Sequence, residues 1–98
     1  MLDGKIVLVT GATRGIGKAI SLTLGLAGAT VIGTATTESG ADNISKVFAD
    51  KKISGKGMKL DVTDNDQVSS LIKNIGEDFG SVDILVNNAG ITRDNILL

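Results

Sequence analysis

The chain has 98 residues, and its ten basic and eleven acidic side chains give a formal net charge of −1. This balance offers no basic surface for nucleic acid. The sequence contains no cysteine and no histidine, which excludes disulfides and thiolate metal sites and removes the commonest metal ligand and general base. Apolar residues make up 42% and charged residues 21%, as in a globular domain, and the length suits one small domain.

The sequence shows neither a secretory signal nor a membrane-spanning run. The opening "MLDGK" lacks the basic and then apolar regions of a secretory signal. No apolar run approaches the roughly 20 residues that a membrane helix needs. We therefore expect a cytoplasmic protein with no membrane partner.

The first half of the chain alternates short apolar runs with longer amphipathic segments. Lys5–Thr10 is rich in β-branched residues and predicts a buried strand. A helix is expected over Ile16–Ala27, with Gly28 ending it. Thr30–Ala35 then predicts a second strand, and Ser39–Asp50 predicts a second helix.

The second half repeats this alternation. Residues 51–57 are polar and contain glycine, so they predict a loop. Residues 58–62 predict a short third strand. Thr63 or Asp64 is expected to cap the next helix, in which apolar residues recur on one face as far as Phe79.

A fourth strand, predicted over residues 82–87, completes a β-α-β-α-β-α-β pattern. Such alternation is typical of a parallel sheet with helices on both faces, and strands that are apolar throughout fit burial on both sides. We therefore predict an α/β fold: the first half of a Rossmann-like, doubly wound parallel sheet in three α-β-α layers. In the doubly wound order, 3-2-1-4, the fourth strand lies beside the first.

Three glycines, Gly11, Gly15 and Gly17, lie between the first strand and the first helix. Parallel sheets bind ligands at the carboxyl ends of their strands, and a helix N-terminus attracts phosphate. Glycines let the backbone turn sharply and approach a ligand closely. The loop is therefore expected to bind phosphate, although its G-x-x-x-G-x-G spacing differs from both G-x-G-x-x-G and the Walker loop. The alternative is a glycine-rich connection without a ligand.

Three motifs carry a resemblance to a known family. "TGATRGIG" resembles the T-G-x-x-x-G-x-G cofactor motif of the short-chain dehydrogenase/reductase family, and "LDVTD" and "NNAG" are similar to its next two motifs, in the family's order. The resemblance covers the whole chain. The longer stretch "NNAGITRDN" is most similar to the members that reduce 3-oxoacyl chains carried on acyl carrier protein.

The resemblance implies a nicotinamide cofactor, and the end of the second strand favours NADP(H). No carboxylate stands near Ala35 to repel a 2′-phosphate. Arg14 and Thr36 match positions that contact this phosphate in the family, and a guanidinium suits it. In the alternatives, Glu38 acts as an NAD-type carboxylate, or Arg14 is simply a solvated charge.

The resemblance also implies which residues hold the cofactor. They are Gly11, Ala12, Thr13, Arg14, Gly15, Ile16, Gly17, Thr36, Asp61, Val62, Asn88, Ala89 and Gly90. Asp61 is expected beside the adenine ring with the backbone of Val62; alternatively it is a strand-end residue or a helix cap. Asn87 is expected to tie the fourth strand to its neighbour. Asp83 and Arg93 receive no role.

The family's catalytic Ser, Tyr and Lys lie after the fourth strand, and this sequence contains no Tyr. We therefore expect residues 1–98 to be the N-terminal part of a single dinucleotide-binding domain, with the catalytic half absent, no catalytic residue and no metal. The resemblance implies an NADPH-dependent reductase of fatty-acid biosynthesis, a homotetramer whose partner is acyl carrier protein. The alternatives are a reductase of another carbonyl compound and a non-catalytic nucleotide-binding module.

Overall fold

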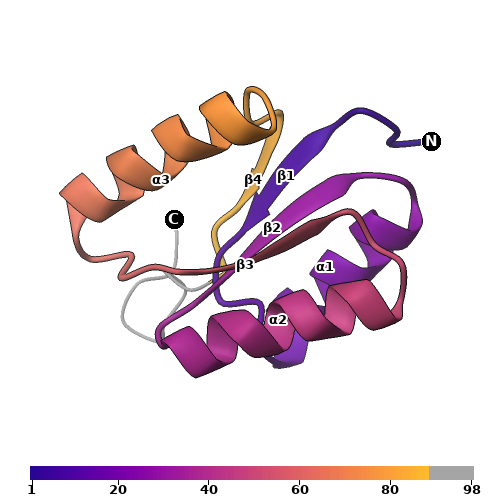
Figure 1. Ribbon diagram of the computed structural model, residues 1–98, viewed down its shortest axis with the longest axis horizontal. Coiled ribbons are helices and arrows are strands. Elements are labelled where there is room, and N and C mark those ends of the chain that lie inside the picture. The colour runs from indigo at the N-terminus through magenta and orange to yellow at the C-terminus, as the bar shows by residue number, and fades with distance from the viewer. Residues whose placement is uncertain (89–98) are drawn as a thin grey trace.

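The computed structural model describes residues 1–88, in which four strands alternate with three helices (Figure 1). In chain order the elements are β1 (Ile6–Val9), α1 (Gly15–Leu26), β2 (Thr30–Ala35), α2 (Glu38–Asp50), β3 (Gly55–Lys59), α3 (Asn65–Asp78) and β4 (Ile84–Val86). All strand pairs are parallel, and the order across the sheet is β3-β2-β1-β4. The predicted fold class and strand order are confirmed.

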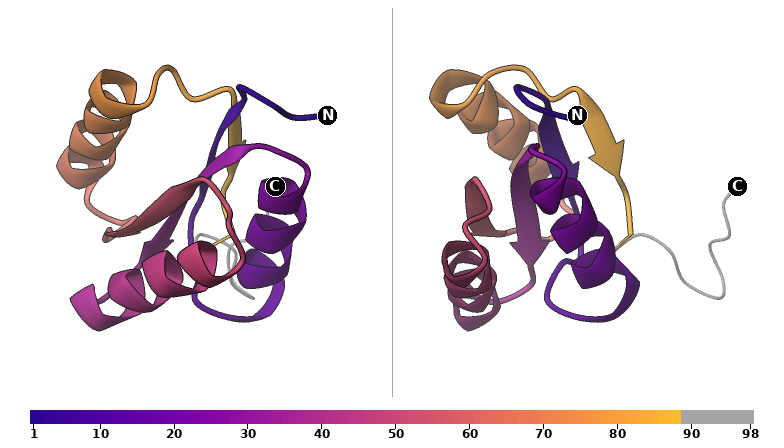
Figure 2. Two further views of the ribbon diagram at one scale, coloured as in Figure 1. Left: turned by 45° about the vertical axis from the view of Figure 1, so that its right-hand side comes forward. Right: turned by 90° about the vertical axis from the view of Figure 1, so that its right-hand side faces the viewer.

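The sheet is the middle of three layers. Helices α1 and α2 cover one face and α3 covers the other (Figures 1 and 2). Successive side chains of β1 alternate between the two faces of the sheet. Val7 packs with the residues beneath α1 and α2, whereas Ile6 and Leu8 pack with those beneath α3. Burying such a side chain stabilises the fold by about 1.5–3 kcal/mol.

Burial on both faces holds only for the two inner strands. Every residue of β1 is buried, and so is all of β2 except Thr30. No residue of the outer strands β3 and β4 is fully buried, and Leu85 is 57% exposed. The physical reason is position, because within residues 1–88 each outer strand has a neighbour on one side only.

The third strand begins earlier than predicted. It runs over Gly55–Lys59 instead of residues 58–62, so the first part of the strand lies in the segment predicted to be a loop. Pairing with β2 outweighs the loop preference of the glycines, since Gly55 pairs with Val31 and Lys59 pairs with Ala35. Gly55 has φ +125°, and a Cβ there would overlap the carbonyl oxygen of Val31.

The first and fourth strands are shorter than predicted, and side chains close both ends of their pairing. The backbone N–H of Ile6 donates to the Asp83 carboxylate over 2.8 Å, so a residue given no role holds the beginning of β1. Beyond the other end, the Thr10 hydroxyl donates to the side-chain oxygen of Asn87 over 3.2 Å. The predicted tie between Asn87 and the neighbouring strand is confirmed.

Asp64, one of the two predicted caps, begins α3. Its carboxylate accepts hydrogen bonds from the backbone N–H groups of Asp66 and Gln67. Leu71 and Ile75 of the predicted apolar face are buried, whereas Phe79 is 38% exposed with the ammonium of Lys56 6.0 Å from its ring centroid.

Candidate functional site

The carboxyl ends of β1, β2 and β3 meet at one edge of the sheet, where a cavity of about 210 Å³ opens. It is smaller than the roughly 300–1,000 Å³ of sites that enclose a whole ligand, so it suits one part of a larger molecule. The residues that line it are Gly11, Thr34, Ala35, Thr36, Leu60, Asp61, Val62 and Thr63. Four of the predicted site residues, from three different segments, therefore surround one cavity.

The glycine loop is held to the sheet by Thr34. The N–H of Gly11 donates to the Thr34 hydroxyl over 3.2 Å, and the N–H of Ala12 donates to the Thr34 carbonyl over 2.9 Å. Gly11 and Gly15 both have positive φ, +67° and +61°. These are conformations that glycine adopts without strain, so the loop needs glycine at both positions.

Gly17 is needed for a different reason, which is close approach. A Cβ at Gly17 would overlap the carbonyl oxygen of Gly11 and would lie 2.7 Å from Nδ2 of Asn88. The amide of Asn88 donates to this same Gly11 oxygen over 3.1 Å. The loop, the first turn of α1 and the residues after β4 therefore meet at one point.

The N-terminus of α1 follows directly from this loop. Arg14 is the N-cap in extended conformation; no side chain caps the helix, and its first turn holds no acidic residue. Arg14, Gly15 and Ile16 are exposed. Unpaired N–H groups and the partial positive charge of a helix end favour an anion, so this exposed end of α1 is chemically suited to one.

Ala12 and Thr13 lie apart from the cavity. Ala12 is 3% exposed and belongs to the core. It packs so closely on β2 that a Cβ at Gly33 would be 2.8 Å from the Ala12 Cβ. Ala12 and Thr13 instead line a small crevice beneath α2. The side chain of Ala12 is therefore part of the packing that supports the loop.

The end of β2 carries no carboxylate. Thr36, which follows the strand directly, is exposed and lines the cavity. Thr37 caps α2 by accepting a hydrogen bond from the N–H of Gly40 over 3.0 Å. Glu38 lies in the first turn of α2, is exposed, and does not line the cavity. A negative charge in the first turn interacts favourably with the helix dipole. This interaction explains the position of Glu38 without any contact to a ligand.

Asp61 is exposed on the cavity wall, and its carboxylate is engaged by Thr63. Oδ1 of Asp61 accepts from the N–H of Thr63 over 2.9 Å and from the Thr63 hydroxyl over 2.6 Å. These two hydrogen bonds lower the pKa of Asp61 below its ordinary value, the side-chain bond most. Asp61 is therefore ionised at neutral pH.

A second cavity of about 170 Å³ adjoins this one. The two share Leu60 and Val62, and the second also reaches Thr10 and Asn87 beyond the ends of β1 and β4. The chain thus forms two adjoining hollows along the carboxyl edge of the sheet.

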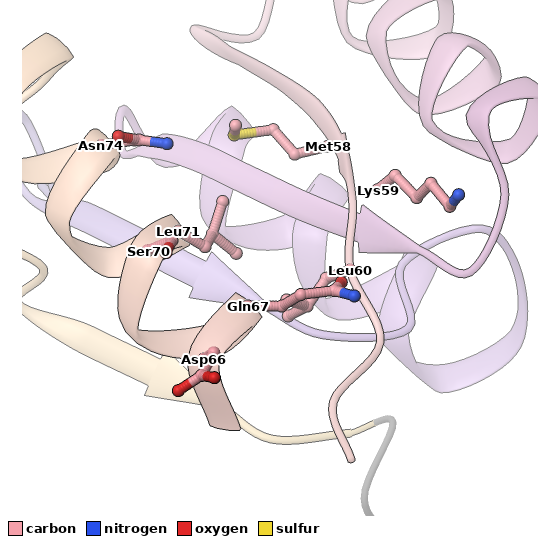
Figure 3. A pocket seen from close by; sticks show the side chains of 8 residues that line it. All are labelled: Met58, Lys59, Leu60, Asp66, Gln67, Ser70, Leu71 and Asn74. Atoms are coloured by element: carbon pink, nitrogen blue, oxygen red, sulfur yellow. The ribbon is translucent and has the colours of Figure 1, made fainter. Parts of the chain in front are cut away.

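A larger cavity of about 290 Å³ lies elsewhere, between β3 and α3 (Figure 3). No residue of the glycine loop lines it. One of its residues, Gln67, still bears on the site, because its side-chain oxygen accepts from the N–H of Asp61 over 3.1 Å. Figure 3 shows Gln67 extending from α3 to the side of Leu60.

Some expectations lie beyond the structural description. Ala89, Gly90 and Arg93 are outside the described residues. Within residues 1–88, no group of three or more acidic side chains gathers as a metal site would require, and no helix is long and apolar enough to cross a membrane.

Sequence reasoning missed Thr34 and Leu60 and considered Thr63 only as a helix cap. Thr34 is 1% exposed within an otherwise apolar strand, and a buried hydroxyl needs a partner. A threonine inside an apolar strand was therefore the signal that could have pointed to Thr34. Thr63 lies two residues after Asp61, a spacing at which Asp side chains commonly bond the backbone.

Comparison with known proteins identifies the family. The family model described as short chain dehydrogenase matches residues 5–97. The chain is similar to proteins named 3-oxoacyl-[acyl-carrier-protein] reductase: 58% identical to that of Haemophilus influenzae over 99% of this chain and 39% of the relative, 59% to that of Salmonella typhimurium (98% and 38%), and 57% to that of Escherichia coli (98% and 38%). It spans about two fifths of their length. The chain belongs to the short chain dehydrogenase family.

Proposed function

We propose that this chain is the NADP(H)-binding part of an enzyme that reduces 3-oxoacyl-[acyl-carrier-protein] to 3-hydroxyacyl-[acyl-carrier-protein] in type II fatty-acid biosynthesis. The observation that carries the proposal is the 57–59% identity, over nearly the whole chain, to reductases named for this reaction. Residues 1–98 would form the N-terminal part of a single dinucleotide-binding domain.

The residues present fit a dinucleotide. Open space lies beside Gly15 at the uncapped N-terminus of α1, where a pyrophosphate would be held by backbone N–H groups. The neighbouring cavity suits the adenosine half, with Asp61 and Val62 beside the base. Asn88, Ala89 and Gly90 would border the remainder of the cofactor. The nicotinamide, when bound, supplies the hydride.

The preference for NADP(H) is supported by charge. A 2′-phosphate adds negative charge at the end of β2, where Thr36 offers a hydroxyl and no carboxylate lines the cavity except Asp61. Arg14, exposed at the N-cap of α1, carries the guanidinium that recognises phosphate through paired hydrogen bonds.

The catalytic residues would lie in the remainder of the enzyme. By resemblance, a Tyr general acid with a Lys and a Ser would follow β4, so no catalytic residue is assigned within residues 1–98. Acyl carrier protein would present the substrate, and the enzyme would be a cytoplasmic homotetramer.

The test is oxidation of NADPH by the full-length protein, followed by absorbance, with acetoacetyl-[acyl-carrier-protein] as substrate and NADH as the alternative donor. We expect turnover that requires the thioester and prefers NADPH. If the enzyme reduces only unrelated ketones, the substrate assignment is wrong and the protein is a reductase of another carbonyl compound. Cofactor binding without any turnover would favour a nucleotide-binding module.

A further inference from the structure

The carboxylate of Asp61 is held by one of its two oxygens. Oδ1 accepts both hydrogen bonds from Thr63, and the hydroxyl bond, at 2.6 Å, is short. Charge-assisted hydrogen bonds of this length are strong. Within residues 1–88, no hydrogen bond to Oδ2 is found. Oδ2 is therefore the acceptor that remains for a ligand in the cavity that both residues line.

The backbone that carries this carboxylate is held on both sides. The N–H of Asp61 donates to Oε1 of Gln67, and the Asp61 carbonyl accepts from the N–H of Asp64 over 3.0 Å. The Gln67 amide in turn donates to the Asp64 carboxylate over 3.2 Å. Because the backbone is held to the beginning of α3, the carboxylate can move only by rotation about the side-chain bonds of Asp61. The hydrogen bonds from Thr63 oppose that rotation.

The chemistry of the free oxygen defines what it recognises. The Thr63 hydrogen bonds keep Asp61 ionised at neutral pH, and an ionised carboxylate only accepts hydrogen bonds. A base in the cavity must therefore turn a donor toward it. On the outer edge of a purine nucleotide, adenine presents an amino donor at C6, whereas hypoxanthine presents an oxygen that the carboxylate repels.

We propose that Thr63 is a positioning residue for base recognition: its hydroxyl holds Oδ1 of Asp61 so that Oδ2 accepts from the 6-amino group of adenine. This inference rests on the proposed function, because it assumes that the cavity takes the adenosine half of the cofactor. It assigns to Thr63, which would act through Asp61, a share of the enzyme's preference for adenine over hypoxanthine.

The test compares two cofactors on four forms of the full-length protein. Dissociation constants are measured by fluorescence titration for NADPH and for its deamino analogue, in which hypoxanthine replaces adenine. The wild type is expected to prefer NADPH about 10-fold. Thr63→Val, which keeps the shape and removes the hydroxyl, should reduce the preference to about 2-fold, chiefly by weakening NADPH binding. Thr63→Ser should retain it, and Asp61→Ala should abolish it.

The contrary results separate the two proposals. If Thr63→Val weakens the binding of both cofactors equally and leaves the ratio of their dissociation constants unchanged, Thr63 is merely structural and the inference is wrong. A wild type that binds both cofactors equally well also overturns the inference, while the proposed dinucleotide site stands. A wild type that binds neither cofactor overturns the proposed function and the inference with it.

Discussion

The side-chain amide of Asn88 donates a hydrogen bond to the carbonyl oxygen of Gly11 over 3.1 Å, across a separation of 77 residues. This bond joins the residues after β4 to the glycine loop. It also occupies the space that a side chain at Gly17 would need. The shape of the loop therefore depends on β4 lying beside β1.

Replacing Gly17 with alanine should destabilise the protein. The added Cβ would overlap the Gly11 oxygen and press on Asn88, and overpacking of this kind costs about 1–3 kcal/mol. The measurement is the free energy of unfolding in urea. Gly76→Ala is the matched control, because Gly76 lies in α3 with open space around it, and alanine there should stabilise by about 0.5–1 kcal/mol. Equal effects of the two substitutions would contradict the close contact at Gly17.

Removing the guanidinium of Arg14 should weaken NADPH binding selectively. We expect Arg14→Ala to raise the dissociation constant for NADPH about 10-fold or more, because a charge-assisted hydrogen bond to the 2′-phosphate is lost. Binding of NADH, which lacks that phosphate, should change by less than about 2-fold. Lys46→Ala, on the exposed side of α2, is the control for loss of one positive charge. An equal loss of affinity for both cofactors would show that Arg14 does not read the 2′-phosphate.

Asp83 should contribute to stability through the beginning of β1. Its carboxylate accepts from the N–H of Ile6 over 2.8 Å, so Asp83→Ala would leave a largely buried donor without its partner. The expected cost is about 1–2 kcal/mol, measured by urea unfolding. Asp83→Asn keeps an acceptor oxygen and should recover most of the loss. If the alanine variant unfolds at the wild-type urea concentration, water replaces the carboxylate at no cost.

The titration of Asp61 should depend on Thr63. Hydrogen bonds from Thr63 to the ionised carboxylate lower the pKa of Asp61, so their stabilisation is present above the ordinary aspartate pKa of about 3.9 and is lost as the pH falls through the lower, folded-state pKa. NMR titration of the carboxyl carbon is expected to show the Asp61 pKa rising toward its ordinary value in Thr63→Val and staying low in Thr63→Ser. An unchanged pKa in the valine variant would mean that the hydroxyl does not hold the carboxylate.

The element pattern was predictable because its signals are local. The β-branched run in β1, the apolar period of α3 and the cap at Asp64 each lie within a few residues of the element that they specify. The beginning of β3 was not predictable, because the glycines of residues 55–57 carry a loop signal. Only alignment with Val31 and its neighbours in β2 makes that segment a strand.

The sequence by itself determined the alternation of strands and helices, the position of the glycine loop and the absence of a carboxylate directly after β2, since all three follow from the order of neighbouring residues. Only the tertiary structure decided that Thr34 holds the loop, that Asp83 bonds Ile6, and that Gln67 bonds Asp61. These pairs join different elements. Their contact depends on which strands and helices lie side by side, and packing of the whole sheet decides this.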